Sequence, residues 1–170
     1  MKHKLILLFL AAALTFSCSS DSEDDNGNET PTEDALVGTW DLTTIEIDDS
    51  VTNDDLEFAK GIVEALVAQD CDLLTLTFAA DGTLTIVERD FSGVSIDVNS
   101  GGDGLSIACP ETQETDTVNW SLDGDQLTIT FEDQTQETVT IQLSGNTLTV
   151  GAEFVDEDNL AGAEAVFEKR

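Results

Sequence analysis

The sequence predicts an all-β fold: an antiparallel up-and-down β-barrel of about eight to ten strands, with one helical insertion near residues 53–69. Two observations carry this prediction. Apolar residues alternate with Thr, Gln, Asn and acidic residues along many short segments, and tight-turn residues separate these segments. A sandwich of the same strands is the alternative, but a closed barrel removes the open edges that invite pairing with another chain.

The alternation is clearest where apolar side chains occupy every second position. Leu74, Leu76 and Phe78 share one face of a segment whose intervening positions are threonines, and Val118 and Trp120 repeat the pattern. Half-buried antiparallel strands look like this, with apolar side chains inward and hydrated ones outward. Strands are therefore predicted at 37–47, 73–80, 83–89, 92–98, 105–109, 115–122, 126–132, 137–143 and 147–155, with a tenth at 162–169.

Turn signals lie between the predicted strands. Asp-Gly pairs at 81–82 and 123–124 and the Ser-Gly-Asn sequence at 144–146 supply residues that accept a positive φ in tight hairpins. A longer Gly-rich loop is expected at 99–104. Because the hairpins are short, consecutive strands are expected to be neighbours in the sheet.

One helix interrupts the strands at 53–69. Asn53 is its expected N-cap, and acidic residues follow in the first turn. A wide apolar arc faces one side of this helix: Leu56, Ala59, Ile62, Val63, Leu66 and Val67. Packing across the barrel wall or one barrel mouth is the ordinary interpretation, and a movable lid over a ligand cavity is the alternative.

Composition excludes several functions. The chain has 36 acidic and 6 basic residues, a net charge of -30, so no basic patch is left for nucleic acid. Its single histidine is His3 and its single methionine is Met1, both in the leader described next. Without them, the remaining chain lacks the base of Ser-His-Asp and Cys-His catalysis, the histidine ligands of zinc sites and the thioether ligands of copper sites. The protein is therefore expected not to be an enzyme.

Residues 1–17 have the pattern of an export signal. Lysines at 2 and 4 precede an apolar run of 10 residues, Leu5–Leu14, and Ser17 precedes Cys18. A run of this length makes roughly 15 Å of helix, about half the thickness of a bilayer core. The segment resembles a bacterial lipoprotein signal, which implies that Cys18 carries acyl chains such as palmitate and anchors the protein to a membrane. An ordinary signal peptide with an incidental cysteine is the alternative.

Residues 18–34 are acidic and lack large apolar side chains, so they are expected to form a disordered tether ahead of a domain at 35–170. Ser19 and the acids after it resemble the export signal that takes some Gram-negative lipoproteins to the outer leaflet of the outer membrane. This resemblance implies an outer-membrane protein that faces the exterior, with anchoring on the periplasmic side as the alternative.

Cys71 and Cys109 remain once Cys18 is acylated, an even pair in an oxidising compartment. They are predicted to form a disulfide, which would remove roughly 4 kcal/mol of denatured-state entropy in a simple chain model. Two separate buried thiols are the alternative.

A family resemblance becomes specific in the ordered set of strand motifs. Gly38-x-Trp40 opens the first strand, 76–84 forms an early hairpin, 118–122 reads Val-Asn-Trp-Ser-Leu, and residues 165–170 at the end of the chain read Ala-Val-Phe-Glu-Lys-Arg. Together these resemble the lipocalin-like domain of small Gram-negative lipoproteins. The resemblance implies that Trp40 packs at the closed end of a barrel, near a basic residue of the last strand; Lys169 and Arg170 are both candidates.

Two functions of different class follow. The first is a barrel that binds a small lipophilic ligand in an apolar interior, a reading that rests on the resemblance. The predicted lining residues are Leu76, Phe78, Leu84, Trp120, Leu122 and Phe131. The second is a structural or adhesive surface lipoprotein whose barrel is filled by its own side chains. In either case the protein is expected to be a monomer without a cofactor.

Carboxylates are the one abundant reactive group. They gather at Asp48, Asp49, Asp54 and Asp55, and again at Glu153, Asp156, Glu157 and Asp158. No segment fits the EF-hand order, so weak calcium binding is expected in place of a dedicated metal site. Two carboxylates suffice for glycoside hydrolysis, but nothing marks a particular pair, and solubility in a salty exterior accounts for the charge.

Overall fold

The computed structural model describes residues 30–90, 96–98, 105–156 and 160–170. The predicted signal peptide, Cys18 and most of the tether lie outside the described residues, as do 92–95 of the fourth predicted strand and the loop at 99–104.

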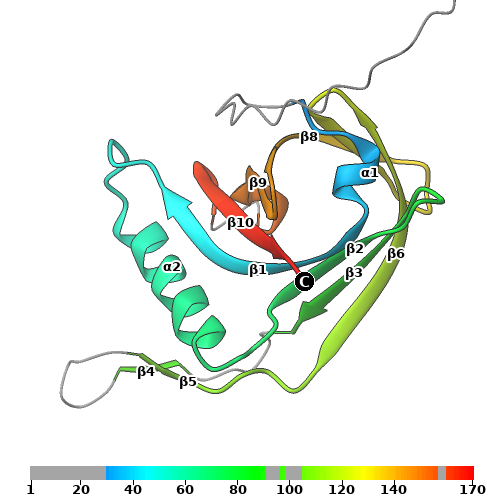
Figure 1. Ribbon diagram of the computed structural model, residues 1–170. Coiled ribbons are helices and arrows are strands. Elements are labelled where there is room, and N and C mark those ends of the chain that lie inside the picture. Colours follow the sequence, from blue (N-terminus) through cyan, green and yellow to red (C-terminus); the bar gives the residue numbers. More distant parts are fainter. Residues whose placement is uncertain (1–29, 91–95, 99–104, 157–159) are drawn as a thin grey trace, which may run out of the picture.

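Eight antiparallel strands close into a barrel in the order β1-β10-β9-β8-β7-β6-β3-β2 (Figure 1). Each strand pairs with the next barrel strand along the chain, and β10 returns to β1, where Trp40 lies opposite Lys169 and Ile47 opposite Ala163. The barrel prediction is confirmed, and the sandwich is not formed. The barrel strands are β1 (Gly38–Ile47), β2 (Leu74–Phe78), β3 (Thr83–Arg89), β6 (Gln113–Asp123), β7 (Gln126–Thr130), β8 (Gln136–Ser144), β9 (Thr147–Gly151) and β10 (Ala163–Lys169).

Two further strands stand apart from the barrel. β4 (Ile96–Val98) and β5 (Leu105–Ile107) pair only with each other, as an excursion between β3 and β6. Residues 96–98 and 105–107 of the predicted strands therefore form a separate two-stranded sheet.

The helix predicted at 53–69 is α2 (Asp54–Val67). The Asn53 side chain accepts a hydrogen bond from the Asp55 amide at 3.1 Å, which is the expected N-cap. Leu56 and Leu66 are buried at the two ends of the helix, which lies beside the end of β1 and close to β5 (Figure 1). None of the described helices is long and apolar enough to cross a membrane.

Two short helical segments differ from the prediction. α1 (Glu33–Leu36) begins within residues assigned to the tether, because Thr32 caps it by accepting from the Ala35 amide at 3.3 Å. The strand predicted at 147–155 ends at Gly151 and continues as the 3₁₀ helix η1 (Ala152–Phe154). There the Ala152 carbonyl accepts from the amides of Val155 and Asp156, which turns the chain away from the sheet.

The two ends of the barrel are built differently. At one, here called the closed end, the β2–β3, β6–β7 and β8–β9 hairpins turn tightly and α1 precedes β1. Gly124 has a φ of +64° at the β6–β7 turn, as the Asp-Gly signal predicted. At the other, the open end, three connections are longer and contain α2, the β4–β5 pair and η1, whereas β7 and β8 are joined by a short turn at 131–135.

Candidate functional site: a pocket at the open end of the barrel

The closed end is filled by large side chains. Trp40 is completely buried, and the rings of Phe78 and Trp120 meet edge to face with centroids 5.3 Å apart. The Trp120 indole N–H donates to the carbonyls of Ala79 and Thr83 at 3.2 and 3.1 Å, so this buried donor is satisfied. The closed half of the barrel is consequently a packed core.

Lys169 completes this end. Its Nζ lies 5.0 Å from the centroid of the Trp40 ring and donates to the Ala35 carbonyl at 2.8 Å, while the Trp40 indole N–H donates to the Leu36 carbonyl at 2.8 Å. Gly38 has a φ of +143°, and a Cβ there would lie 2.5 Å from Cε of Lys169. The Gly-x-Trp sequence is thus explained by the close passage of the Lys169 side chain.

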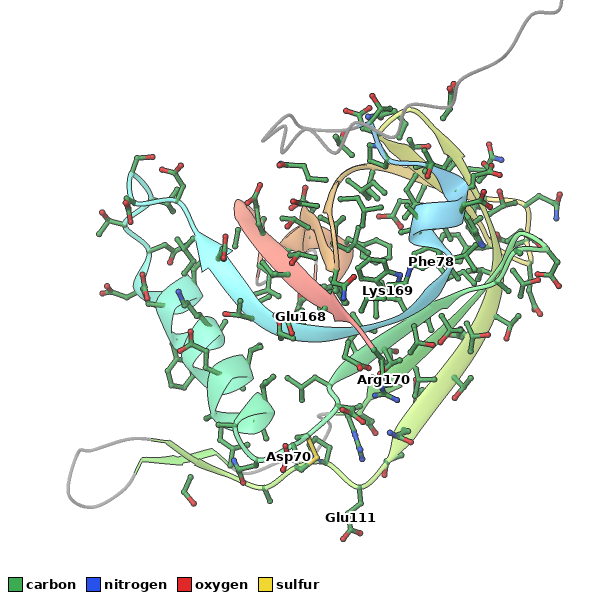
Figure 2. The ribbon with its side chains drawn as sticks, in the orientation of Figure 1. Asp70, Phe78, Glu111, Glu168, Lys169 and Arg170 are labelled. Carbon is green, nitrogen blue, oxygen red and sulfur yellow. A yellow bond between two sulfur atoms is a disulfide. The ribbon has the colours of Figure 1, made fainter. Side chains whose placement is uncertain are left out.

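Arg170 has a different role from its neighbour. Its Nε and one terminal nitrogen both donate to the Asp41 carboxylate at 2.8 Å, and a 3.4 Å contact reaches Asp72. The Asp41 hydrogen bonds and charge raise the pKa of the Arg170 guanidinium. Figure 2 shows Lys169 and Arg170 pointing apart. Of the two candidates for the basic partner of Trp40, the structure selects Lys169.

The six residues predicted to line a ligand cavity do not line the open-end pocket. Leu76, Phe78, Leu84 and Trp120 are buried in the closed half. Leu122 is partly buried near the β6–β7 turn, and Phe131 begins the β7–β8 turn, where its amide donates to the Thr135 carbonyl. Alternation shows which face of a strand a side chain occupies, but it does not show at what height in the barrel the core ends.

A pocket of about 740 Å³ lies at the open end, between α2 and the barrel. Its walls come from three parts of the chain, and most of the lining is apolar. α2 contributes Phe58, Ala59, Ile62 and Val63; the barrel wall contributes Leu42, Leu73 and Leu74; and the segment after η1 contributes Val155, Leu160 and Ala161. The helix thus covers this mouth of the barrel through its apolar side.

Phe58 is the most unusual of these residues. Its exposed fraction is 48%, and it is one of two large apolar side chains that are exposed among the described residues, the other being Val51. Phe58 lies outside the predicted apolar arc of the helix, although an aromatic residue between Glu57 and Lys60 was the available signal. An exposed ring at the edge of an apolar pocket is a surface that a ligand can cover.

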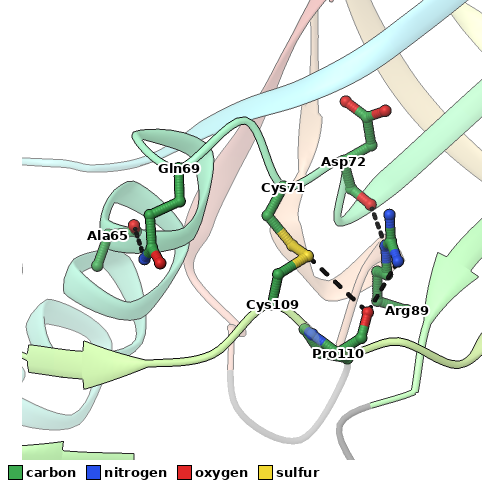
Figure 3. Close-up of a disulfide and its surroundings, with 7 residues drawn as sticks. All are labelled: Ala65, Gln69, Cys71, Asp72, Arg89, Cys109 and Pro110. Atoms are coloured by element: carbon green, nitrogen blue, oxygen red, sulfur yellow. Dashed lines mark hydrogen bonds between the residues drawn. A yellow bond between two sulfur atoms is a disulfide. The ribbon is translucent and has the colours of Figure 1, made fainter.

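Polar residues also line the pocket: Asn53, Asp55, Glu88, Arg89 and Asp156. The Arg89 guanidinium donates through Nε to the Asp72 carbonyl at 3.0 Å and through Nη1 to the Pro110 carbonyl at 2.8 Å. It therefore ties together two loop segments that meet at the pocket wall (Figure 3).

A disulfide joins the same two segments. Cys71 and Cys109 are bonded, with their Cα atoms 5.7 Å apart, which confirms the predicted pair over the alternative of separate thiols (Figure 3). The Cys71 amide donates to the Leu66 carbonyl at 3.1 Å. The end of α2 is consequently tied both to β2 and to the loop after β5.

The match to known proteins agrees with this architecture. The pattern of the lipocalin-like domain family matches residues 36–150, from the last residue of α1 into β9. This chain belongs to the lipocalin-like domain family.

Among solved structures, the lipocalin-like domain is similar to a lipocalin-like protein from Bacteroides uniformis, with 16% identity and a TM-score of 0.42 over 80% of this chain and 99% of the other. It is also similar to an uncharacterized protein from Bacteroides eggerthii, with 15% identity and a TM-score of 0.42 over 79% of this chain and 98% of the other. No curated protein matches the chain.

The carboxylates of the lipocalin-like domain do not gather into a metal centre within the part of the chain that the structure describes, where no three His, Cys, Asp or Glu side chains come close enough to share an ion. Glu157 and Asp158 lie outside that part. Asp48 instead accepts hydrogen bonds from the Ser50 hydroxyl and amide at 2.5 and 2.8 Å, which lower the pKa of its carboxyl group. This carboxylate therefore stabilises a turn.

Proposed function

We propose that this lipocalin-like domain binds a small lipophilic molecule in the open-end pocket and catalyses no reaction on it. The observation that carries the proposal is the pocket itself, about 740 Å³ in volume with apolar walls from α2, the barrel and the segment after η1. Ligand pockets for small molecules have volumes of roughly 300–1,000 Å³ and mostly apolar linings. The pocket has both properties.

Phe58 adds an energetic argument. Each square ångström of apolar surface removed from water contributes about 25 cal/mol, so covering the exposed half of a phenylalanine, roughly 100 Å², contributes about 2.5 kcal/mol. A lipophilic ligand in the pocket would obtain this from Phe58 in addition to its contacts with Ile62 and Leu73.

The proposal places the protein at the cell envelope as a monomer. Residues 1–17 would be removed, acyl chains on Cys18 would hold the protein to the outer membrane, and residues 18–34 would separate the barrel from the bilayer. An exterior-facing position is preferred over the periplasmic face because of the acids after Ser19. The disulfide supports an oxidising compartment.

Binding of a neutral environment-sensitive dye tests the pocket, with Phe58→Glu as the variant. A carboxylate at this position would be desolvated by an apolar ligand, so we expect dye affinity to fall about tenfold or more. Val51→Glu is the matched control, since Val51 is also an exposed apolar residue but does not line the pocket. Equal affinities for the two variants would contradict the proposed site.

A structural or adhesive role with a filled barrel is the second candidate, and the packed closed half favours it. Native mass spectra distinguish the two. A bound mass of a few hundred daltons that is lost on denaturation supports ligand binding. A bare protein that also binds no dye supports the structural role, and a mass that disappears with chelator would point to calcium.

A further inference from the structure

We infer that the ligand of the open-end pocket is an amphiphile with a positively charged head group, such as a lipophilic amine, and not a fatty-acid-like carboxylate. The inference rests on the proposed function, because it concerns the same pocket. Two observations support it: the charged residues that line the pocket, and the position of Glu88 on the inner face of the barrel.

Acidic groups outnumber basic groups in the pocket lining. Asp55, Glu88 and Asp156 contribute carboxylates, and Arg89 contributes the one guanidinium. Two N–H groups of Arg89 are directed to the backbone carbonyls of Asp72 and Pro110, so this side chain serves the wall of the pocket. A ligand carboxylate would be repelled by three carboxylates, which the single guanidinium does not offset.

Glu88 lies on the inner face of the barrel. Glu88 is four positions after buried Leu84 on β3, so the two residues lie on the same face of the strand. Its partner across the ladder is Glu114, which lies on the same face of β6 as buried Val118. Like charges directly opposite each other destabilise a strand pair. Glu88 also lines the pocket, so its carboxylate contributes to the negative potential at the mouth.

The net charge of the whole chain also favours a cationic ligand. Its net charge of -30 attracts cations and repels anions, and the effect reaches about one Debye length from the surface. The apolar walls favour a hydrocarbon body, and the potential selects the head group. Together they fit an amine at the rim with its chain between α2 and the barrel.

Calorimetric titration with three ten-carbon probes tests the inference: decylammonium, decanol and decanoate. The full-length Cys18→Ser protein is used, so that no attached acyl chain can occupy the pocket. At about 10 mM salt we expect decylammonium to bind about tenfold more tightly than decanol and decanoate to bind weakest. At about 1 M salt, where the Debye length is about 3 Å, the three affinities should converge.

Glu88→Gln is the variant that locates the effect. It should lower decylammonium affinity about threefold or more relative to decanol affinity. Glu168→Gln is the matched control, because it makes the same change in net charge on the outer face at the closed end (Figure 2). An equal loss in both variants would mean that net charge alone, not the pocket, attracts the amine, and would overturn the inference.

The outcomes separate the inference from the proposed function. If decanol binds and decanoate binds as tightly as decylammonium or more tightly, the charge selection is wrong and the pocket remains. If none of the three probes binds, the proposed function fails and the inference fails with it.

Discussion

Lys169, at the end of the last strand, covers the indole ring of Trp40 near the start of the first, with Nζ 5.0 Å from the ring centroid. The same ammonium group donates to the Ala35 carbonyl at the end of α1. Residues more than a hundred positions apart are thereby held together where the barrel closes. We expect the closed end to depend on this contact, whereas the pocket lies at the open end.

Replacing Lys169 tests that dependence. Lys169→Met keeps most of the apolar side chain but removes the cation–π contact and the hydrogen bond to Ala35, so we expect a loss of about 1–2 kcal/mol in the free energy of unfolding by urea. Lys60→Met is the control, since its ion pair with Glu64 is an exposed i,i+4 contact at 3.9 Å, worth about 0.5 kcal/mol or less. Equal losses would show that Lys169 has no special role.

Gly38→Ala is expected to act through Lys169. The new Cβ would lie 2.5 Å from Cε of Lys169, and this flexible side chain would move away and lose its contact with Trp40. Strain at a φ of +143° adds a cost of about 1–3 kcal/mol. The double variant with Lys169→Met should therefore lose less than the sum of the single losses in urea unfolding. Strict additivity would argue against the contact.

The disulfide should stabilise the domain by restricting its unfolded chain. Cys71 and Cys109 are separated by 38 positions, for which the loop-entropy model gives about 4 kcal/mol. The Cys71→Ser, Cys109→Ser double variant should unfold at a correspondingly lower urea concentration and no longer respond to reductant. Intact mass should rise by two hydrogens when the wild-type protein is reduced; an unchanged mass would disprove the bond.

Asp133 provides a prediction on pH. Hydrogen bonds from the Thr135 hydroxyl at 2.6 Å and amide at 3.0 Å lower the pKa of its carboxyl group. Because the folded pKa lies below the unfolded one, the stabilisation is present above about pH 4 and is lost as the pH falls through the folded pKa.

Carboxyl NMR titration of Thr135→Val measures this effect directly. The Asp133 pKa should rise toward its ordinary value in the variant. Thr138→Val serves as the comparison, because the Thr138 hydroxyl bonds to Thr128 and not to a carboxylate. A pKa for Asp133 that stays low in Thr135→Val would assign the shift to another cause.

Most of the barrel could be predicted from local sequence. Alternation places residues on faces and Asp-Gly pairs place turns, and both depend on a few neighbouring residues. The same pattern also indicates which basic residue contacts Trp40. Lys169 is two positions after buried Phe167, so alternation places Lys169, and not Arg170, on the inner face. The strand prediction at 152–154 was wrong, because Ala152 is buried in the 3₁₀ helix as it would be in a strand.

The pocket could not be predicted in the same way. Its walls combine α2 with Leu73 and Leu160, which are far apart in the sequence and meet only through tertiary packing. The predicted lining residues were inward-facing, but most of them, such as Leu76 and Phe78, belong to the filled half. Whether an inward side chain packs in the core or lines the pocket depends on the position of α2 relative to the barrel.

We have proposed that an apolar ligand binds between α2 and the open end of the barrel. Amide NMR spectra recorded during titration with decanol test it most directly. We expect saturable shifts that are largest around Phe58, Ile62 and Leu73, with little change near Trp40. Shifts centred on Phe78 and Trp120 at the closed end, or no saturable shift at all, would contradict it.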